Sequence, residues 1–392
     1  MRERRQTVSE TAASTDRRCT RRCFIHLAAA ASLGGCLRAD VSASGGETYS
    51  VALLGDTHFD STDTKRYHSE YLFSTSEERY KMHLAEHVRN ADMWKERLPS
   101  LLKASGVCAK ADTAFILHMG DLVQGDCNNT ATHVRMLDDA MRTIKEAYGG
   151  RLPFVMTVGN HDIRGDFPTD GTREAMDGWF VRTMSRELGR KVESTSFSFS
   201  HGPDAFIVAD FNAPRPKFET LKKLLDDCSG ARHVFLVTHG QAIPSGAGRW
   251  FLFGERTRNR ERRELLHVLA RHNAIVLAGH THCLEYYDLE LPEGRVTQFV
   301  ANSVWMKPAQ AVPKILDEGA AAYGNRTKAK KLRPGRKGGH HDLVAEYRPF
   351  VRDYLFAQAA GHYRLEIGPS RVAVAFYGGA ATEPTRTFLL RG

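Results

Sequence analysis

Five short apolar runs along the chain each end next to polar residues that can bind a metal ion. We expect each run to form a strand in the core, because short apolar runs bounded by glycine and polar residues are typical of buried strands. Open α/β sheets place their ligands beyond the carboxyl ends of the strands, so the polar residues are expected along one edge. The runs are Ser50–Leu54, Phe115–Met119, Phe154–Val158, Val234–Thr238 and Ile275–Ala278.

The residues that follow these runs are carboxylates, an amide and imidazoles. This set holds too many donors for one metal ion, and it suits a hydrolytic centre that binds two. In chain order the residues are Asp56, His58, Asp121, Asn160, His239, His280 and His282.

The rest of the pattern predicts helices and a second group of strands. Ser76–Ala104 repeats apolar residues at helical spacing, and Pro99 is expected to kink that helix. Strands that alternate with helices predict parallel β-α-β units. Ser196–Ser200 and Phe206–Asp210 predict successive strands of a second sheet, so we expect an α/β fold, a two-sheet β-sandwich flanked by helices. Further helices are predicted at Ala131–Tyr148, Phe218–Cys228 and Glu261–His272.

The pattern changes after the apolar run Gln298–Ala301. Residues 306–345 are rich in alanine, glycine and lysine with little periodicity, which predicts a basic surface insertion. Tyr347–Ala359 is expected to be helical, and His362–Ile367 with Arg371–Tyr377 predicts a terminal hairpin. The predicted domains are a catalytic domain at 48–305, the insertion at 306–345, and a helix and hairpin at 346–392 that complete the domain.

The net charge of +9 is concentrated in two short segments. Residues 1–35 hold seven arginines against three acidic residues, and Arg326–Lys337 holds seven basic residues and no acidic one. The rest of the chain is therefore close to neutral, and no nucleic-acid partner is expected. The basic segment is interpreted as a solvated loop, or else as a flap over an anionic substrate or a contact with anionic lipid headgroups.

Residues 1–36 predict an export signal. Thr20–His26 resembles a twin-arginine motif, and the apolar stretch Phe24–Gly35 is too short to span a bilayer. Leu33–Cys36 resembles a lipobox, which would make Cys36 the lipidated first residue, followed by a tether at 37–47. The alternative is a signal without lipid, cleaved a few residues later. We expect an exported protein of the periplasm or cell envelope, attached to the membrane through Cys36.

Cysteine usage leaves two interpretations open. An even number of cysteines in an oxidising compartment allows two disulfides, and buried free thiols are the alternative. None of these thiols is expected to bind the metal ions. The cysteines of the folded domain are Cys108, Cys127, Cys228 and Cys283.

The polar motifs resemble those of the calcineurin-like metallophosphoesterases. That family has Asp-x-His, Gly-Asp, Gly-Asn-His-Asp/Glu, a lone His and Gly-His-x-His in this order, and the chain holds all five between Val51 and His282. The resemblance implies a four-layer αββα fold. It also implies two bound metal ions, with Mn, Fe or Zn favoured by oxygen and imidazole donors. The implied ligands are Asp56, His58 and His282 for the first ion, Asn160, His239 and His280 for the second, and Asp121 as a bridge between them.

The same resemblance implies how the reaction proceeds. A hydroxide activated by both ions would attack phosphorus in line with the departing oxygen. His161 lies beside the ligand Asn160 and is the candidate acid that protonates that oxygen. Asp162 is expected to orient His161 or to cap the following turn. Arg164 is expected to clamp a phosphate or to lie on the surface.

Gln124 is a departure from two subfamilies. Purple acid phosphatases have a metal-binding Tyr three residues after the Gly-Asp aspartate, and phosphoprotein phosphatases have an Asp there. Gln124 therefore argues against an Fe(III)–tyrosinate centre and against the His–Asp pair of the protein phosphatases. What remains is the broad bacterial group that includes cyclic-nucleotide phosphodiesterases and assorted phosphomonoesterases.

Taken together, these patterns predict an exported, metal-dependent phosphoesterase that acts on a phosphate monoester or diester. Small-molecule phosphate esters and phospholipid-type esters both fit the site. The alternative is a catalytically silent scaffold of the same fold that binds a protein partner or a membrane surface. Such a scaffold would be expected to lose metal ligands or His161, whereas this chain keeps them all.

Overall fold

The computed structural model describes residues 48–60, 77–126, 130–164, 171–212, 218–244, 251–254, 256–325 and 340–392. The chain divides into two units after Gly35, and every described residue belongs to the second unit. The predicted export signal, the tether, Cys127 and the basic segment Arg326–Lys337 lie outside the described residues. None of the helices in the described ranges is long and apolar enough to cross a membrane.

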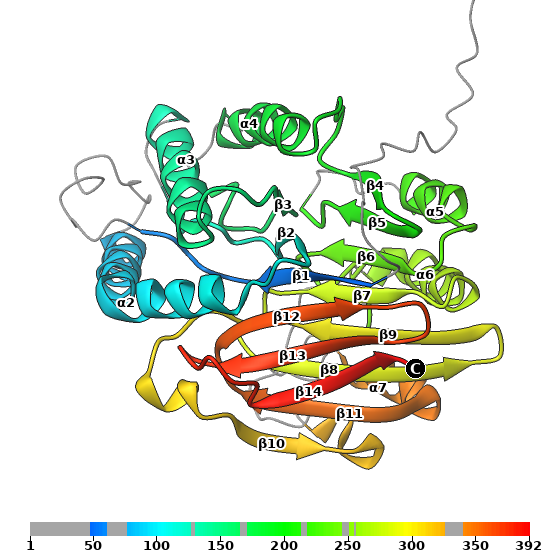
Figure 1. Cartoon of the computed structure of the whole chain (residues 1–392). Coiled ribbons are helices and arrows are strands. Elements are labelled where there is room, and N and C mark those ends of the chain that lie inside the picture. The colour runs from blue at the N-terminus through cyan, green and yellow to red at the C-terminus, as the bar shows by residue number, and fades with distance from the viewer. Residues whose placement is uncertain are drawn as a thin grey trace, which may run out of the picture. The chain divides into compact units, whose positions relative to one another are not determined.

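The first sheet of the described residues has six strands in the order β14-β13-β12-β1-β2-β3 (Figure 1). One half of this sheet is parallel, because β1, β2 and β3 run in the same direction, and the other half, β12 to β14, is antiparallel. The predicted terminal hairpin is confirmed as β12 and β13. The strands are β1 (Tyr49–Leu54), β2 (Thr113–His118), β3 (Phe154–Met156), β12 (Gly361–Ile367), β13 (Val372–Gly378) and β14 (Arg386–Arg391).

The second sheet has eight strands in the order β10-β11-β8-β9-β7-β6-β5-β4. The predicted pair of strands after the third motif is confirmed as β4 and β5, which pair antiparallel, and β5, β6, β7 and β9 run parallel. The strands are β4 (Phe197–His201), β5 (Asp204–Ala209), β6 (Val234–Thr238), β7 (Ile275–Ala278), β8 (Leu284–Leu291), β9 (Gly294–Val300), β10 (Lys314–Glu318) and β11 (Val351–Gln358).

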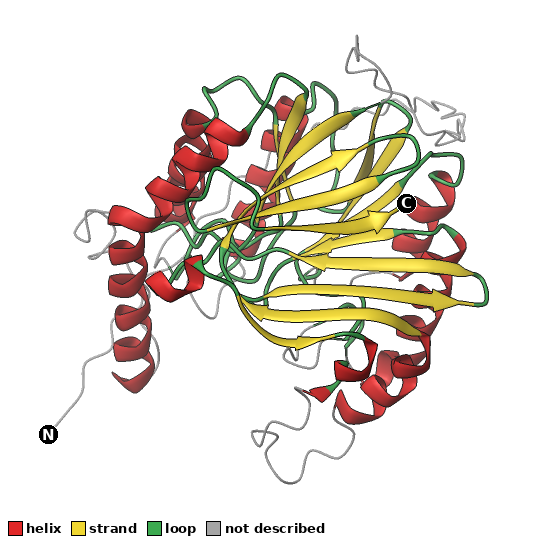
Figure 2. Ribbon diagram, turned by 60° about the horizontal axis from the view of Figure 1, so that its bottom comes forward, coloured by secondary structure: helices red, strands yellow, loops and turns green. Residues whose placement is uncertain are grey.

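Helices cover the outer faces of the two sheets (Figure 2). In the first sheet, α2 contacts β12 and α4 contacts β3. In the second sheet, α5 contacts β5 and α6 contacts β9. The predicted two-sheet sandwich flanked by helices is therefore confirmed. The helices are α2 (Glu77–Cys108), α3 (Thr130–Ala147), α4 (Gly171–Glu187), α5 (Phe218–Asp227), α6 (Asn259–Arg271) and α7 (His340–Tyr347), with 3-10 turns at Arg256–Arg258, Pro308–Ala311, Ala320–Ala322 and Arg348–Phe350.

The helix expected at Tyr347–Ala359 is wrong, because most of this range forms strand β11. Tyr354 and Phe356 pack into the cluster beneath α5 and α6, whereas Leu355 and Ala357 pack into the cluster between the sheets. Both faces of β11 are thus buried, so its sequence lacks the polar alternation that marks a half-exposed strand.

Part of the predicted insertion also belongs to the fold. Lys314–Glu318 forms β10, which pairs antiparallel with β11 at the edge of the second sheet. The strand is short and largely exposed, which explains why its hydrophobic pattern is weak.

Aromatic side chains fill the space between the two sheets. Phe115 on β2 meets Phe206 on β5 edge to face at 5.3 Å, and Phe206 stacks on Phe235 of β6 at 4.6 Å. All three rings are buried. This contact holds the carboxyl ends of β1 and β2 opposite those of β6 and β7, where the polar motifs follow.

Replacing Phe235 by Ala is expected to lower the free energy of unfolding by about 3–5 kcal/mol, because it leaves a cavity between the sheets. Urea unfolding in the presence of EDTA measures this change without a contribution from bound metal. The control is Leu389→Ala, whose side chain is 44% exposed, and its effect should stay within about 0.5 kcal/mol. Equal effects of both variants would contradict the packing described.

Candidate metal centre

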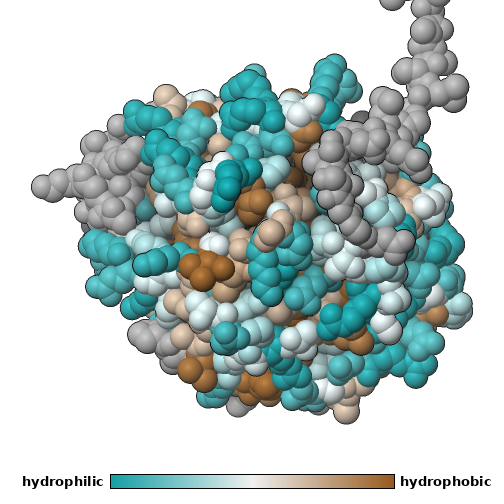
Figure 3. Space-filling view, in the orientation of Figure 1, coloured by the Kyte–Doolittle hydropathy of each residue, from teal (hydrophilic) through white to brown (hydrophobic). Residues whose placement is uncertain are grey.

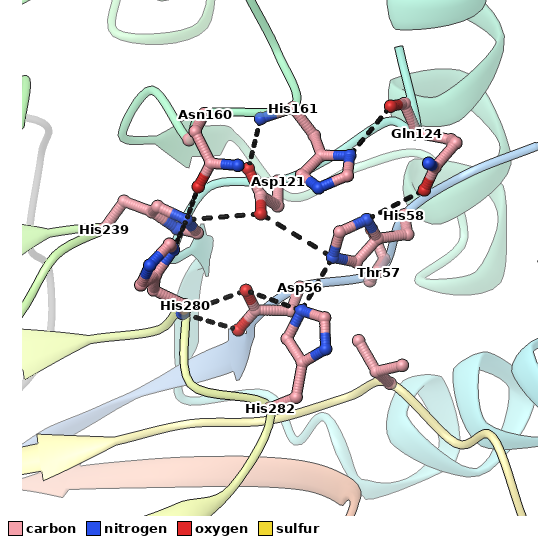
Figure 4. A network of polar contacts seen from close by, with 12 residues as sticks. Asp56, Thr57, His58, Asp121, Gln124, Asn160, His161, His239, His280 and His282 are labelled. Carbon is pink, nitrogen blue, oxygen red and sulfur yellow. Dashed lines mark hydrogen bonds and ion pairs between the residues drawn. The ribbon is translucent and has the colours of Figure 1, made fainter. Parts of the chain in front are cut away.

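The predicted site residues come from both sheets rather than from one edge of a single sheet. Asp56 and His58 follow β1, and Asp121 follows β2, in the first sheet. His239 follows β6, and His280 and His282 follow β7, in the second. Figure 4 shows these side chains pointing toward one another, with Asn160 and His161 from the loop after β3. The sandwich therefore closes the site between two facing edges.

Asp121 lies at the middle of the cluster and belongs to two groups of donors. Its Oδ2 is 3.6 Å from His58 Nε2 and 3.2 Å from His239 Nε2. In each group the donor atoms lie within 4.8 Å of one another, and the groups are Asp56, His58, Asp121 and His282, and Asp121, His239 and His280.

Asn160 joins the second group. Its Oδ1 lies 3.2 Å from His239 Nε2, and that nitrogen also lies 3.0 Å from His280 Nδ1. The structure thus brings together all seven residues that the sequence singles out as metal ligands.

The electrostatics of the cluster fit a bound cation. Burial raises the pKa of the Asp56 carboxyl well above its usual value. Burial also opposes ionisation of Asp121, but His239 and His161 outweigh it and hold the pKa of Asp121 well below its usual value. His239 responds in the opposite sense: burial lowers its pKa, and the Asp121 carboxylate more than reverses this, to about 9. A dry site with two carboxylates needs positive charge, and the oxygen and imidazole donors suit Mn, Fe or Zn.

The backbone of most of these residues adopts the left-handed region, which is uncommon outside glycine. Each such residue costs on the order of 1–3 kcal/mol and persists only where its surroundings fix it. Strain of this kind gathers at functional sites, and here it accompanies the sharp turns after β1, β2 and β7. The φ angles are 54° at Asp56, 44° at His58, 51° at Asp121, 77° at His280 and 53° at His282.

Gly159, the glycine of the third motif, has no room for a side chain. A Cβ atom at this position would lie 2.1 Å from the backbone nitrogen of Asp121 and 2.2 Å from its Oδ1. The loop after β3 can approach the central carboxylate only because this residue has no side chain.

Two hydrogen bonds orient the imidazoles on either side of Asp121. His239 Nδ1 donates to the carbonyl oxygen of Met119 at 2.8 Å, and His58 Nδ1 donates to Gln124 Oε1 at 3.2 Å. Each bond leaves Nε2 facing the cluster. Bonds of this kind fix the tautomer of a metal-binding histidine and raise its basicity.

Helix α2 supports the site from behind, which sequence analysis missed. Asn90 Nδ2 donates to Gln124 Oε1 at 2.5 Å, and Gln124 Nε2 donates to Glu86 Oε2 at 3.3 Å. Trp94 Nε1 donates to the carbonyl oxygen of Thr57 at 3.0 Å. Polar residues on a helix usually face solvent, so the sequence carries no signal for this role. At position 124, where the sequence departs from the two subfamilies, Gln124 therefore links α2 to His58.

His161 is held beside the bridge without belonging to either donor group. Its backbone N–H donates to Asp121 Oδ1 at 2.7 Å, and its Nδ1 donates to the carbonyl oxygen of Gln124 at 2.9 Å. Arg164 Nη1 lies 2.7 Å from His161 Nε2, while Arg164 Nε donates to Asp126 Oδ1 at 3.0 Å. Burial, reinforced by the charge of Arg164, lowers the pKa of His161.

Asp162 has a structural role that differs from the predicted cap of the following turn, because its carboxyl contacts the loops before it. Its Oδ2 accepts a hydrogen bond from the Gly159 N–H at 2.8 Å, and its Oδ1 accepts one from the Val123 N–H at 3.2 Å. The carboxyl is fully buried, and burial together with Asp121 raises its pKa to about 7. Asp162 therefore ties the loop after β3 to the loop after β2.

None of the cysteines in the described ranges belongs to the two donor groups. Cys108 is a free thiol, and Cys228 is buried. Cys127 lies outside the described residues, so the predicted disulfides stay a prediction.

Replacing Gln124 by Met is expected to weaken metal binding about 10- to 100-fold, because His58 loses the acceptor that fixes its Nδ1–H. Competition with a chelating dye measures the affinity. Gln358→Met, at an exposed glutamine of β11, serves as the matched control and should bind metal like the parent protein. An unchanged affinity in Gln124→Met would show that this hydrogen bond does not support the site.

Comparison with known proteins gives a consistent assignment. Residues 49–284 match the family model described as calcineurin-like phosphoesterase. Among solved structures, a purple acid phosphatase from yellow lupin (Lupinus luteus) seeds is similar, with a TM-score of 0.51 and 14% sequence identity over 88% of this chain and 54% of that chain. A structure of PhoD is similar with a TM-score of 0.49 and 11% identity over 88% of this chain and 69% of that chain.

The share of each chain that is matched decides whether a match shows the fold alone or the family. The chain spans about half the length of the purple acid phosphatase, and a likeness at this identity shows the fold. A search of curated protein sequences finds no match. The family model, in contrast, covers more than half of the chain and includes every residue of the two donor groups. The chain therefore belongs to the calcineurin-like phosphoesterases, a family of metal-dependent hydrolases that act on phosphoric ester bonds.

Proposed function

We propose that this protein is an exported phosphoesterase that hydrolyses a phosphate monoester or diester with a hydroxide activated by two metal ions. The observation that carries the proposal is the pair of donor groups that share Asp121. Only a carboxylate offers two anionic oxygens to neighbouring cations, and such pairs of ions act together on a phosphoryl group.

The donor residues would bind the two ions in two sets. Asp56, His58 and His282 would hold one ion, and Asn160, His239 and His280 the other, with Asp121 contacting both. When bound, the ions supply a Lewis acid for the phosphoryl oxygens and lower the pKa of water to near neutrality. The chain itself excludes bulk water, since Asp56, Asp121 and His239 are almost completely buried.

His161 would supply the proton that the departing oxygen needs. The hydrogen bond from Nδ1 to the carbonyl of Gln124 fixes the ring, so that Nε2 is the atom that holds and delivers the proton. Arg164 lies beside His161, where its N–H groups can hold a phosphoryl oxygen.

The proposal that the protein is exported rests on the N-terminal pattern. The twin-arginine-like motif, the short apolar stretch and the lipobox-like end support an envelope-located protein anchored through Cys36. Twin-arginine export carries folded proteins, which suits an enzyme that acquires its metal ions before it crosses the membrane.

Hydrolysis of p-nitrophenyl phosphate and bis-p-nitrophenyl phosphate by the purified protein, with Mn, Fe, Zn or EDTA, tests the enzyme directly. We expect metal-dependent turnover that EDTA removes and that Asp121→Asn loses, because an amide offers only one neutral oxygen to the ions. The preferred ester identifies the substrate class. A metal-loaded protein that turns over neither ester, nor any of a broad panel, would instead favour the silent scaffold.

A second experiment tests the role of His161. His161→Ala should lower kcat for phenyl phosphate by about 10²–10⁴-fold, but should lower kcat for p-nitrophenyl phosphate much less, because p-nitrophenolate leaves without a proton. His267→Ala, at a half-exposed histidine of α6, is the control and should leave both rates unchanged. Equal losses with both esters would rule out proton donation by His161.

A further inference from the structure

Two carboxylates hold the Arg164 side chain beside His161, and the proposed mechanism gives neither of them a role. Arg164 Nε donates to Asp126 Oδ1 at 3.0 Å, and Arg164 Nη2 lies 3.6 Å from Glu86 Oε2. On the other side of the guanidinium, Nη1 lies 2.7 Å from His161 Nε2. The guanidinium is therefore contacted from three directions, by the loop after β2, by α2 and by the loop after β3.

Asp126 is the more deeply buried of the two carboxylates. Its side chain is 3% exposed, against 25% for Glu86 and 29% for Arg164. The face of the molecule in Figure 3 is mostly hydrophilic, and an ion pair on such a surface adds little stability. A carboxylate that water hardly reaches needs a cation close to it, and charge-assisted hydrogen bonds of this kind are strong. Asp126 is therefore the stronger partner of Arg164.

The backbone places Asp126 next to Arg164. The Asp126 N–H donates to the carbonyl oxygen of Arg164 at 2.7 Å, so main chain and side chain both join the two residues. Asp126 adopts the left-handed region, with a φ of 60°, which persists only where its surroundings fix it. At the preceding Gly125, a Cβ atom would lie 2.3 Å from the carbonyl oxygen of His161. The two loops can approach this closely only because Gly125 has no side chain.

The same carboxylate also contacts the residue that orients a metal ligand. Gln124 Nε2 donates to Asp126 Oδ2 at 3.4 Å, and Gln124 Oε1 accepts the hydrogen bond from His58 Nδ1. The His161 ring meets the His58 ring edge to face, with 4.4 Å between the ring centroids, and Figure 4 shows the two rings next to each other. Arg164 is therefore placed to meet an anion bound at the first donor group.

A fixed guanidinium binds an anion better than a mobile one. A long side chain loses rotamer freedom when it is ordered, and that cost weakens binding if the ordering happens only when the ligand arrives. Ion pairs that form beforehand remove most of this cost. They also set the plane of the guanidinium, and thus the directions in which its N–H donors point.

We propose that Asp126 is a positioning residue, which holds the Arg164 guanidinium in the orientation that binds the phosphoryl oxygens of the ester. Glu86 assists it from α2. The inference rests on the proposed phosphoesterase activity and adds residues that act through Arg164 rather than on the substrate. Asp126 belongs to neither donor group, so its role is separate from metal binding.

A double-mutant cycle with Asp126→Asn and Arg164→Ala in the metal-saturated protein tests this. The affinity for inorganic phosphate is measured by calorimetry, and kcat/KM is measured with p-nitrophenyl phosphate. Arg164→Ala should lower both about 10- to 100-fold, because a charge-assisted hydrogen bond to the phosphoryl group is lost. Asp126→Asn should lower both by a smaller factor, at least about twofold. The double variant should match Arg164→Ala, because Asp126 acts only through Arg164.

Chemical rescue gives a readout that a merely structural role would not change. Guanidinium chloride at millimolar concentration should restore part of the activity of Arg164→Ala, because the free cation can occupy the place of the missing side chain. The same addition should not rescue the double variant, in which the carboxylate that holds the cation is replaced by an amide.

Two further variants complete the design. Glu86→Gln, at a less buried carboxylate, repeats the cycle with Arg164→Ala and covers the case in which Asp126→Asn folds poorly. Its loss should be smaller and should again vanish when Arg164 is absent. Asp92→Asn, at a carboxylate of α2 that is 63% exposed, is the matched control and should leave both quantities unchanged.

The outcomes separate the two proposals. Losses that multiply in the double variant, or rescue by guanidinium that persists in it, would overturn the positioning role while the phosphoesterase stands. Absence of metal-dependent turnover of any ester would overturn the phosphoesterase, and the cycle in phosphate affinity would still decide the role of Asp126.

Discussion

The geometry of the site depends on one buried carboxylate, Asp121, which contacts side chains from both sheets. Asp121 follows β2, and its Oδ2 lies close to the imidazole of His58 from the first sheet and to that of His239 from the second. An anion in so dry a position is tolerated only with positive charge and hydrogen bonds close to it. The protein supplies a hydrogen bond through the His161 N–H, and the neighbouring imidazoles of His239 and His161 supply positive charge.

This requirement explains features that look unrelated along the chain. Five residues of the cluster adopt left-handed backbone conformations, and Gly159 has no room for a side chain. The aromatic contact from Phe115 through Phe206 to Phe235 sets how closely the sheets approach. A thicker core would separate His239 from Asp121, so the packing between the sheets determines the geometry of the site. Helix α2 supports the site from outside the sandwich, since Trp94 donates a hydrogen bond to the carbonyl oxygen of Thr57 in the first motif.

Sequence analysis succeeded where local pattern and chemistry coincide. Each of the five apolar runs is a strand, and the residues that follow them meet in one cluster because the sandwich brings the carboxyl ends of strands from both sheets together. It failed at β11, which is buried on both faces and therefore resembles a helix, and it did not predict α4. It also missed Asn90 and Glu86, because contacts from a distant helix leave no periodic signal. Asp162 could be assigned only once its partners, the Gly159 and Val123 N–H groups, were visible.

Electron paramagnetic resonance of the protein loaded with Mn, combined with metal analysis, tests the central claim most directly. Two ions that share Asp121 should be bound per chain and should give the spectrum of a spin-coupled pair. One ion per chain, or two ions with independent spectra, would contradict a centre built around a bridging carboxylate.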